Sequence, residues 1–167
     1  MDGVDEIIAQ WNRERPDLDV GPMALIGRLG RLREVLSRRQ EEVFARFGLN
    51  SSGFDVLATL RRAGPPHALS PGELMEQMMI SSGTMTNRID QLAKAGLVER
   101  QQNPDDRRGM IVSLTDKGFA LIDEAVTAHV ENQHRLVSML AEPERAALND
   151  LLKSYLERLR QRPGHPD

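Results

Sequence analysis

The stretch from residue 70 to residue 115 constrains the fold of this 167-residue chain more than any other. It opens with Ser70, Pro71 and Glu73, which form a capping box with proline at the preferred first position of a helix. The helix that follows is short, and after a tight turn a second helix is predicted over residues 81–95. A pair of short helices joined by a tight turn is therefore expected here.

Two extended segments follow this helix pair. Residues 97–102 and 110–114 are separated by a turn-rich segment, residues 103–109, and the second of them alternates apolar with other residues. This pattern predicts a β-hairpin. The order of short helix, turn, second helix and hairpin is that of a winged helix-turn-helix, so the fold class is mainly α with a small β-hairpin wing.

Long helices with apolar stripes flank this unit. Hydrophobic residues make up 40% of the chain and aromatic residues only 4%, which favours a helical core of aliphatic side chains. The first long helix begins near residue 21, a shorter one covers residues 51–63, and two more follow residue 115. The apolar stripe of the first long helix recurs at steps of three, four or seven residues. It consists of Leu25, Leu29, Leu32, Leu36, Val43 and Phe47.

Charge and composition narrow the class of protein. The net charge of −3 argues against nonspecific coating of nucleic acid, and acidic residues concentrate at the two ends of the chain. The absence of cysteine excludes disulfides, cysteine-bound zinc and thiol redox sensing. No apolar run approaches the length that spans a bilayer, and the first residues are acidic, unlike a signal peptide. We expect a cytoplasmic protein with no membrane partner.

An enzyme is not indicated. The four histidines are scattered, and His129 and His134 are five residues apart, which places them on different faces of a helix. The sequence has neither a Walker loop nor a G-x-G-x-x-G motif. We therefore predict no catalytic residue, no metal site and no cofactor; a protein-interaction module that does not bind DNA remains as an alternative.

The second helix of a winged helix-turn-helix lies in the major groove, and arginines of the wing suit the adjacent minor groove. Serine and threonine at the start of that helix allow close approach and bind either phosphates or bases. The alternative is that these residues only cap helices and that the hairpin loop is a solvated turn. The residues expected to contact DNA are Ser70, Ser81, Ser82, Thr84, Met85, Thr86, Asn87, Arg88, Arg107 and Arg108.

The sequence over residues 69–74, 81–92, 95–98 and 106–115 resembles the MarR family. The resemblance implies a homodimer that represses nearby genes from palindromic DNA and is released by a small molecule. It implies dimerisation helices over residues 21–50 and 116–162 of one single domain (1–167), with an N-terminal extension over 1–20 and a DNA-binding region over 51–115. It also makes Arg108 the wing arginine, braced by Asp106. Where the common family wing carries a further arginine, this chain has Asp105, which weakens the expected wing contact.

The N-terminal extension is similar to that of the urate-responsive subgroup of this family. The resemblance implies a ligand site made by Trp11, Asp55, Arg88 and Arg100. A planar anion needs an aromatic face and guanidinium donors, and it would repel Asp55 while displacing the helix that carries Arg88. The alternatives are another carboxylate or aromatic anion as ligand, or purely structural roles. In the latter, Trp11 is a hydrophobic staple for the extra helix of the extension, Asp55–Arg100 is an ion pair, and Arg88 contacts a phosphate.

Overall fold

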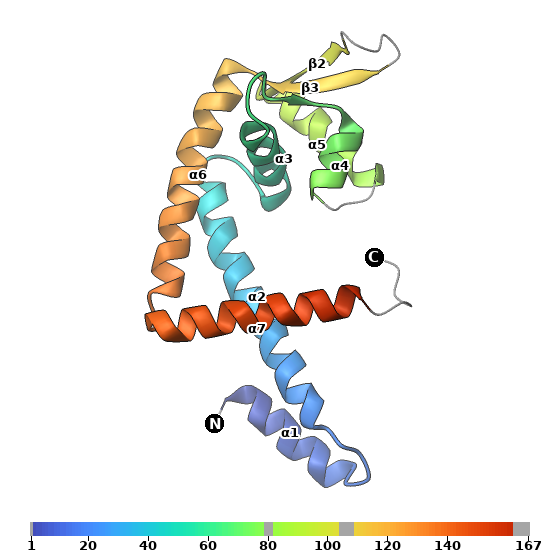
Figure 1. The fold of residues 1–167 in the computed structure, drawn as a ribbon, viewed down its shortest axis with the longest axis vertical. Coiled ribbons are helices and arrows are strands. Elements are labelled where there is room, and N and C mark those ends of the chain that lie inside the picture. Colours follow the sequence, from blue (N-terminus) through green and yellow to red (C-terminus); the bar gives the residue numbers. More distant parts are fainter. Residues whose placement is uncertain (1, 79–81, 104–108, 162–167) are drawn as a thin grey trace. The chain divides into compact units, whose positions relative to one another are not determined.

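A computed structural model describes residues 2–78, 82–103 and 109–161 of the chain (Figure 1). Its elements are helices and the short strands of one small sheet. The elements are α1 (Gly3–Glu14), α2 (Gly21–Ala45), α3 (Ser51–Arg62), β1 (Ala68–Leu69), α4 (Pro71–Met78), α5 (Ser82–Lys94), β2 (Val98–Gln102), β3 (Met110–Leu114), α6 (Asp116–Val137) and α7 (Glu142–Arg160). The predicted mainly helical fold with a small wing is confirmed.

The chain forms two compact units, Met1–His129 and Val130–Asp167. Helix α6 begins in the first unit and ends in the second, and α7 belongs to the second. Within the described ranges, none of the helices combines the length and the apolar character that a bilayer crossing requires.

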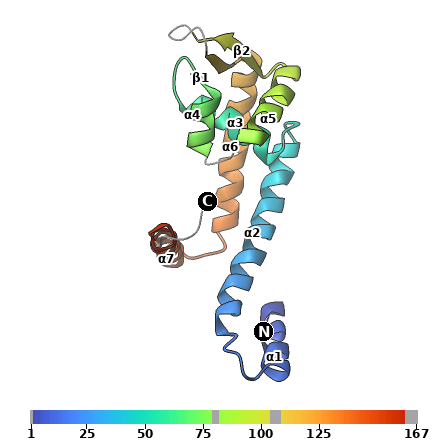
Figure 2. The same cartoon turned by 90° about the vertical axis from the view of Figure 1, so that its right-hand side faces the viewer.

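The wing is a three-stranded antiparallel sheet with strand order β1-β3-β2. Strands β2 and β3 form the predicted hairpin, in which Val98 pairs with Leu114 and Gln102 pairs with Met110. Strand β1, which the sequence analysis did not predict, adds two residues to the other edge of β3. Figure 2 shows this sheet next to α3, α4 and α5, so the wing and the helix pair form one lobe.

The core of this lobe is aliphatic. Leu57 and Leu60 of α3, Leu74 of α4 and Ile122 of α6 are all fully buried, and Ile89 of α5 is 2% exposed. Each such side chain contributes about 1.5–3 kcal/mol to folding through the apolar surface that it removes from water. The core therefore fixes α5 against α3 and α4, so that its opposite face is free to meet a partner.

Local signals set the ends of these helices. The Asn50 side chain caps α3 by accepting from the Gly53 amide at 2.8 Å. At α4 the predicted capping box is confirmed: Glu73 accepts from the Ser70 amide at 2.7 Å, and its own amide donates to the Ser70 hydroxyl at 3.2 Å. Gly96, at φ +70°, follows α5 in the left-handed conformation that glycine adopts without strain.

Helix α1 lies within the N-terminal extension, where the sequence analysis mentions an extra helix without bounds. Asp2 caps it, accepting from the amides of Val4 and Asp5. Val4 is 3% exposed and packs where Gly27 of α2 leaves room for it. Arg28 of α2 pairs with Asp2 at 2.9 Å and also with Asp5. The extension is thus a helix held against α2.

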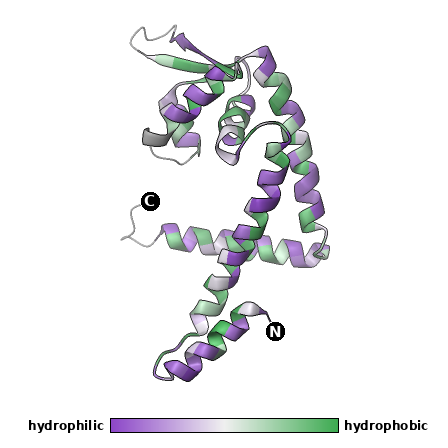
Figure 3. Ribbon diagram, turned by 180° about the vertical axis from the view of Figure 1, so that it is seen from behind, coloured by the Kyte–Doolittle hydropathy of each residue, from purple (hydrophilic) through white to green (hydrophobic). Residues whose placement is uncertain are grey.

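Long apolar stretches of the chain lack a cover. On α2 only Val43 and Phe44 are buried, whereas Leu25 is 59% exposed. No described residue of α7 is buried, and its Leu151 is 69% exposed. Figure 3 shows hydrophobic residues distributed among polar ones along both helices. The predicted stripe on the first long helix is therefore present, but the single chain leaves most of it open to water.

Candidate DNA-binding surface and ligand pocket

Helix α5 divides into a buried and an exposed face. Met85, Ile89 and Leu92 recur at steps of four and three residues and are 1%, 2% and 5% exposed. Thr86 and Asn87 lie on the exposed face, where a partner can reach them. The prediction that Met85 contacts DNA was wrong, because this side chain shares the helix face that packs into the core; its spacing from Ile89 and Leu92 carried the signal.

Arg88 lies at the border between these two faces. Its side chain is half-buried, and its Nε is fully enclosed without a hydrogen-bond partner among the described residues. A buried guanidinium N–H without an acceptor costs free energy that a suitable anion would recover. Arg88 is therefore a cationic group of α5, the helix predicted to lie in the major groove (the recognition helix), with unused donor capacity on its protein side.

Asp55 of α3 is the acidic neighbour of Arg88. Partial burial raises the pKa of Asp55 above 3.8, and the positive charges of Arg88 and Arg62 oppose this rise. Glu41 of α2 raises the pKa further, while His129 of α6 lowers it. Charges from α2, α3, α5 and α6 thus converge on one carboxylate that is still exposed on its outer side.

His129 was not predicted to belong to this site. Its ring centroid lies 4.9 Å from that of Phe54 and 5.2 Å from that of Phe44, and these two phenyl rings stack on each other at 4.2 Å. Burial lowers the pKa of His129, and Asp55 opposes the shift. His129 therefore joins an aromatic cluster with Phe44 and Phe54, and sequence spacing alone gave no sign of it.

Arg62 was also missed by the sequence analysis. Its guanidinium donates to the backbone carbonyl of Gln77 near the end of α4, at 3.1 Å. A cation at the C-terminus of a helix satisfies a carbonyl that the helix leaves open and complements the helix dipole. Arg62 thereby connects α3, beside Asp55, with the helix that precedes the recognition helix.

Arg100 of β2 pairs with Asp90 of α5 at 2.6 Å. The alternative that Arg100 and Asp55 form a structural ion pair was wrong, because an acidic partner on the adjacent helix lies within reach. The pair joins the wing to the recognition helix. A ligand that binds Arg100 would therefore compete with the contact that joins β2 to α5.

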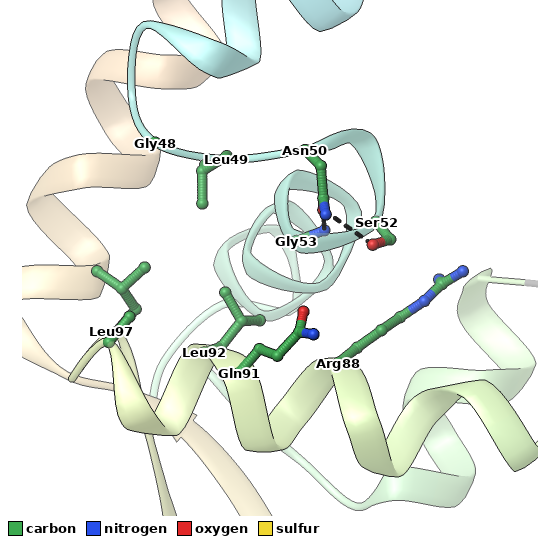
Figure 4. Close-up of a pocket in the computed structure, with 10 residues that line it drawn as sticks. Gly48, Leu49, Asn50, Ser52, Gly53, Arg88, Gln91, Leu92 and Leu97 are labelled. Atoms are coloured by element: carbon green, nitrogen blue, oxygen red, sulfur yellow. Dashed lines mark hydrogen bonds between the residues drawn. The ribbon is translucent and has the colours of Figure 1, made fainter.

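A small open pocket adjoins Arg88 (Figure 4). It lies between the loop before α3 and the inner side of α5, with Gln91 and Leu92 pointing into it. Two donors at the start of α3 are already used, since Asn50 accepts from the Gly53 amide and Glu41 from the Ser51 amide. An anion in this pocket would therefore depend on the guanidinium of Arg88, which extends along its edge.

The fourth residue of the predicted ligand set lies elsewhere. Trp11 is 43% exposed on α1, which packs against α2. The structure therefore brings Asp55 and Arg88 together, places Arg100 on the neighbouring strand with Asp90, and does not bring Trp11 to the same elements.

Part of the predicted DNA contact set lies outside the described residues. This holds for Ser81, Asp106, Arg107 and Arg108, and for the side chains of Ser82 and Thr84. Ser70 lies within the described range, where its hydroxyl serves the capping box of α4.

The base of the wing is joined to α6 by several hydrogen bonds. The Thr115 hydroxyl donates to the Gly96 carbonyl at 2.7 Å and accepts from the Gly118 amide at 3.0 Å. Lys117 donates to the Ala95 carbonyl at 2.8 Å. These bonds tie the end of the recognition helix to the start of α6.

Over the described residues, no three histidine, aspartate or glutamate side chains are grouped as a metal ion would require.

Comparison with known proteins agrees with this arrangement. Residues 49–110 match the profile of the MarR family. The chain is 44% identical over 149 residues to the HTH-type transcriptional regulator PecS of Dickeya dadantii, covering 89% of this chain and 90% of PecS. It is 31% identical to the multiple antibiotic resistance protein MarR of Escherichia coli, covering 77% of this chain and 90% of MarR.

The fold comparison adds a DNA complex. A crystal structure of a mutant MarR from E. coli complexed with operator DNA superposes with a TM-score of 0.70 at 27% identity, covering 87% of this chain and 97% of the other. AbsC, a MarR family transcriptional regulator from Streptomyces coelicolor, gives a TM-score of 0.74 at 25% identity, covering 87% of this chain and 97% of AbsC.

Proposed function

Because this chain belongs to the MarR family of DNA-binding transcriptional regulators, we propose that it acts as a homodimer that binds a palindromic operator and leaves it when a small anion such as urate binds beside the recognition helix. The family consists of transcriptional regulators, not enzymes. The dimer, the palindrome and the anion go beyond what membership of the family establishes.

The proposal rests above all on the surroundings of Arg88. This residue belongs to the recognition helix, yet its enclosed Nε faces the protein and its charge acts on Asp55. A group that belongs to a DNA-reading helix, lines a pocket and acts on the charge of Asp55 is suited to transmit occupancy of the pocket to the helix. Thr86 and Asn87 are exposed, and among the described residues no hydrogen bond or ion pair links them to the pocket.

On the DNA side, we assign base reading to the first half of α5 and backbone contacts to the wing. Thr86, Asn87 and Arg88 would act together with Ser81, Ser82 and Thr84, and Arg107 and Arg108 would enter the minor groove with Asp106 as brace. Two-fold symmetry would place the two recognition helices about 34 Å apart, one turn of DNA. The uncovered apolar faces of α2 and α7 support a dimer, since exposed apolar stripes of this length mark association surfaces.

On the ligand side, we assign anion binding to Arg88 and Arg100, an aromatic face to Trp11, and a repulsive response to Asp55. An anion that pairs with Arg100 would draw it from Asp90, and one that pairs with Arg88 would remove the positive charge that Asp55 faces. Both changes act on α5. A differential affinity of about 1–3 kcal/mol between the two states would weaken DNA binding roughly 5- to 150-fold.

Gel-shift titration of the DNA upstream of the chain's own gene tests the proposal, with urate and with a panel of other carboxylate and aromatic anions. We expect a shift on a palindromic fragment that urate or another planar anion abolishes, and that persists with anion in the variants Trp11→Ala and Arg100→Ala. No shift on any upstream palindrome would overturn the regulator. A shift that every anion leaves unchanged, or that anions abolish equally in both variants, would overturn the proposed ligand pocket.

A further inference from the structure

We propose that Thr115, which caps α6, and Lys117, in the first turn of α6, are positioning residues for DNA recognition. They hold the backbone that follows the recognition helix and so fix the direction in which that helix points. Neither residue belongs to the DNA-contact set or the ligand set assigned above. The inference rests on the proposed function in one respect, since it takes α5 as the helix that reads bases. It does not depend on the anion.

The end of α5 is closed by a compact turn. The Leu97 amide donates to the Leu92 carbonyl at 3.0 Å, and the Gly96 amide donates to the Ala93 carbonyl at 2.9 Å. These two bonds are the pair that defines a Schellman motif. Leu92 and Leu97 are each 5% exposed, as expected for the apolar contact that accompanies this motif. The turn is therefore a rigid extension of α5, and whatever holds the turn also holds the helix.

Three consecutive carbonyls of this turn are bound from the start of α6. The Thr115 hydroxyl donates to the Gly96 carbonyl at 2.7 Å, and the Thr115 amide donates to the Leu97 carbonyl at 3.2 Å. The Lys117 ammonium donates to the Ala95 carbonyl at 2.8 Å. A cation at the C-terminal end of a helix also complements the helix dipole. The turn therefore cannot rotate without breaking hydrogen bonds to these two residues.

Helix α6 is itself fixed to the lobe independently of α5. Ile122 is fully buried in the core, and Asp123 pairs with Arg61 of α3 at 2.7 Å. Nearer its start, α6 approaches the turn after α5 so closely that position 118 has room for glycine alone. The first half of α6 thus provides a fixed frame, against which its cap and its first turn orient the end of the recognition helix.

The exposure of Lys117 raises a competing role, that of a direct phosphate contact. Positioning is favoured because the ammonium already binds a carbonyl oxygen at the end of α5. The two roles differ in their salt dependence. A lost phosphate contact lowers the slope of log K against log salt concentration by about 0.9, whereas a lost positioning contact leaves the slope unchanged.

Binding to two pools of labelled duplexes, followed by fluorescence anisotropy, tests the inference. The wild-type protein selects the specific pool from random duplexes, and the unselected mixture is the nonspecific pool. Thr115→Val keeps the shape of the side chain but removes its hydroxyl, and Lys117→Met keeps most of the length but removes the charge. Thr115→Ser and Lys117→Arg restore the donors. Thr127→Val and Lys153→Met are matched controls, because the Thr127 hydroxyl donates within α6, to the Asp123 carbonyl at 2.9 Å, and Lys153 lies exposed on α7.

We expect Thr115→Val and Lys117→Met to lower the affinity for the selected duplexes roughly tenfold, which corresponds to about 1.4 kcal/mol and to the net worth of one hydrogen bond. Affinity for the unselected pool should stay within about twofold, because the phosphate contacts that supply nonspecific binding are kept. Thr115→Ser and Lys117→Arg should recover wild-type binding, and both controls should match wild type. The salt slope should equal that of wild type in every variant.

An equal loss on both pools, an undiminished affinity for the selected duplexes, or a salt slope lowered by about 1 in Lys117→Met would overturn the inference. Lys117 is exposed, so Lys117→Met decides the matter even if Thr115→Val does not fold, which circular dichroism checks. Asn87→Ala is measured alongside. A wild-type base preference in that variant would overturn the reading role of α5 and the inference with it, whereas failure of the two positioning variants alone leaves that role intact.

Discussion

Replacing Gly118 with alanine tests how the base of the wing is joined to α6. An alanine Cβ at this position would lie 1.9 Å from the carbonyl oxygen of Leu97 and 2.8 Å from its carbon, far inside the 3.4 Å at which ordinary contacts begin. Both atoms belong to the backbone, so no side-chain rotation relieves the clash. The first turn of α6 must move away from the start of β2.

This displacement has two costs. Overpacking of a close contact costs about 1–3 kcal/mol. The hydrogen bonds across the junction, from the Thr115 amide to Leu97 at 3.2 Å and from Lys117 to Ala95 at 2.8 Å, would also lengthen, at about 1 kcal/mol each. Gly118→Ala should therefore lower the free energy of unfolding by about 3–5 kcal/mol, which for a chain of this size lowers Tm by roughly 6–20 °C.

Urea and thermal denaturation at one fixed protein concentration measure the effect, because the stability of a dimer depends on concentration. Gly72→Ala in α4 is the matched control, since the nearest atom to its new Cβ would be the Ser70 hydroxyl oxygen at 3.9 Å. It should change stability by less than about 1 kcal/mol, in the favourable direction. If the two variants unfolded alike, the close approach of α6 to the wing would be refuted.

Three further changes have defined outcomes. Hydrogen bonds from Ser70 lower the pKa of Glu73, so the stability that its carboxylate contributes is present at neutral pH and is lost as pH falls through the lowered pKa. Glu73→Ala should therefore be less stable than wild type at pH 7 and approach the stability of wild type below pH 4.5, which urea titration at several pH values measures. Burial raises the pKa of Asp55, so the stability contributed by its protonated form is complete below pH 3.8 and is lost as pH rises. Relative to wild type, Asp55→Asn should gain stability as pH rises from 3.8, and a stability difference that does not change with pH would contradict the assigned environment. Arg108→Ala should weaken binding about equally across DNA sequences and lower the slope of log K against log salt concentration by about 1. A change in base preference in a competition assay would show that the wing reads bases.

The parts of the fold that could be predicted from the sequence are marked by residues only a few positions apart. Ser70 and Glu73 form the expected box, Gly96 ends α5, and the alternation in residues 110–114 gives a strand. Helix α1 had a comparable signal in the acidic residues Asp2 and Asp5, but the extra helix of the extension was given no bounds. Strand β1 spans two residues, too few for any periodicity to show.

The site could be predicted only where it depends on residues that are close together in the sequence. The spacing of Met85 from the buried residues of α5 assigned it to the core, and this signal was overlooked. The pair of Arg100 with Asp90 depends on how β2 leaves the end of α5. The approach of His129 to Asp55 depends on packing between elements more than 70 residues apart. Neither leaves a trace in local sequence.

The central claim is that Arg88 couples anion binding to DNA binding, and reciprocity tests it most directly. Calorimetric titration of urate into the free protein and into its operator complex gives two dissociation constants, and their ratio must equal the factor by which saturating urate weakens operator binding. We predict an equal ratio of roughly 5–150 in wild type, and a ratio near one in Arg100→Ala. Urate that binds the free protein and the operator complex with the same affinity would contradict the account.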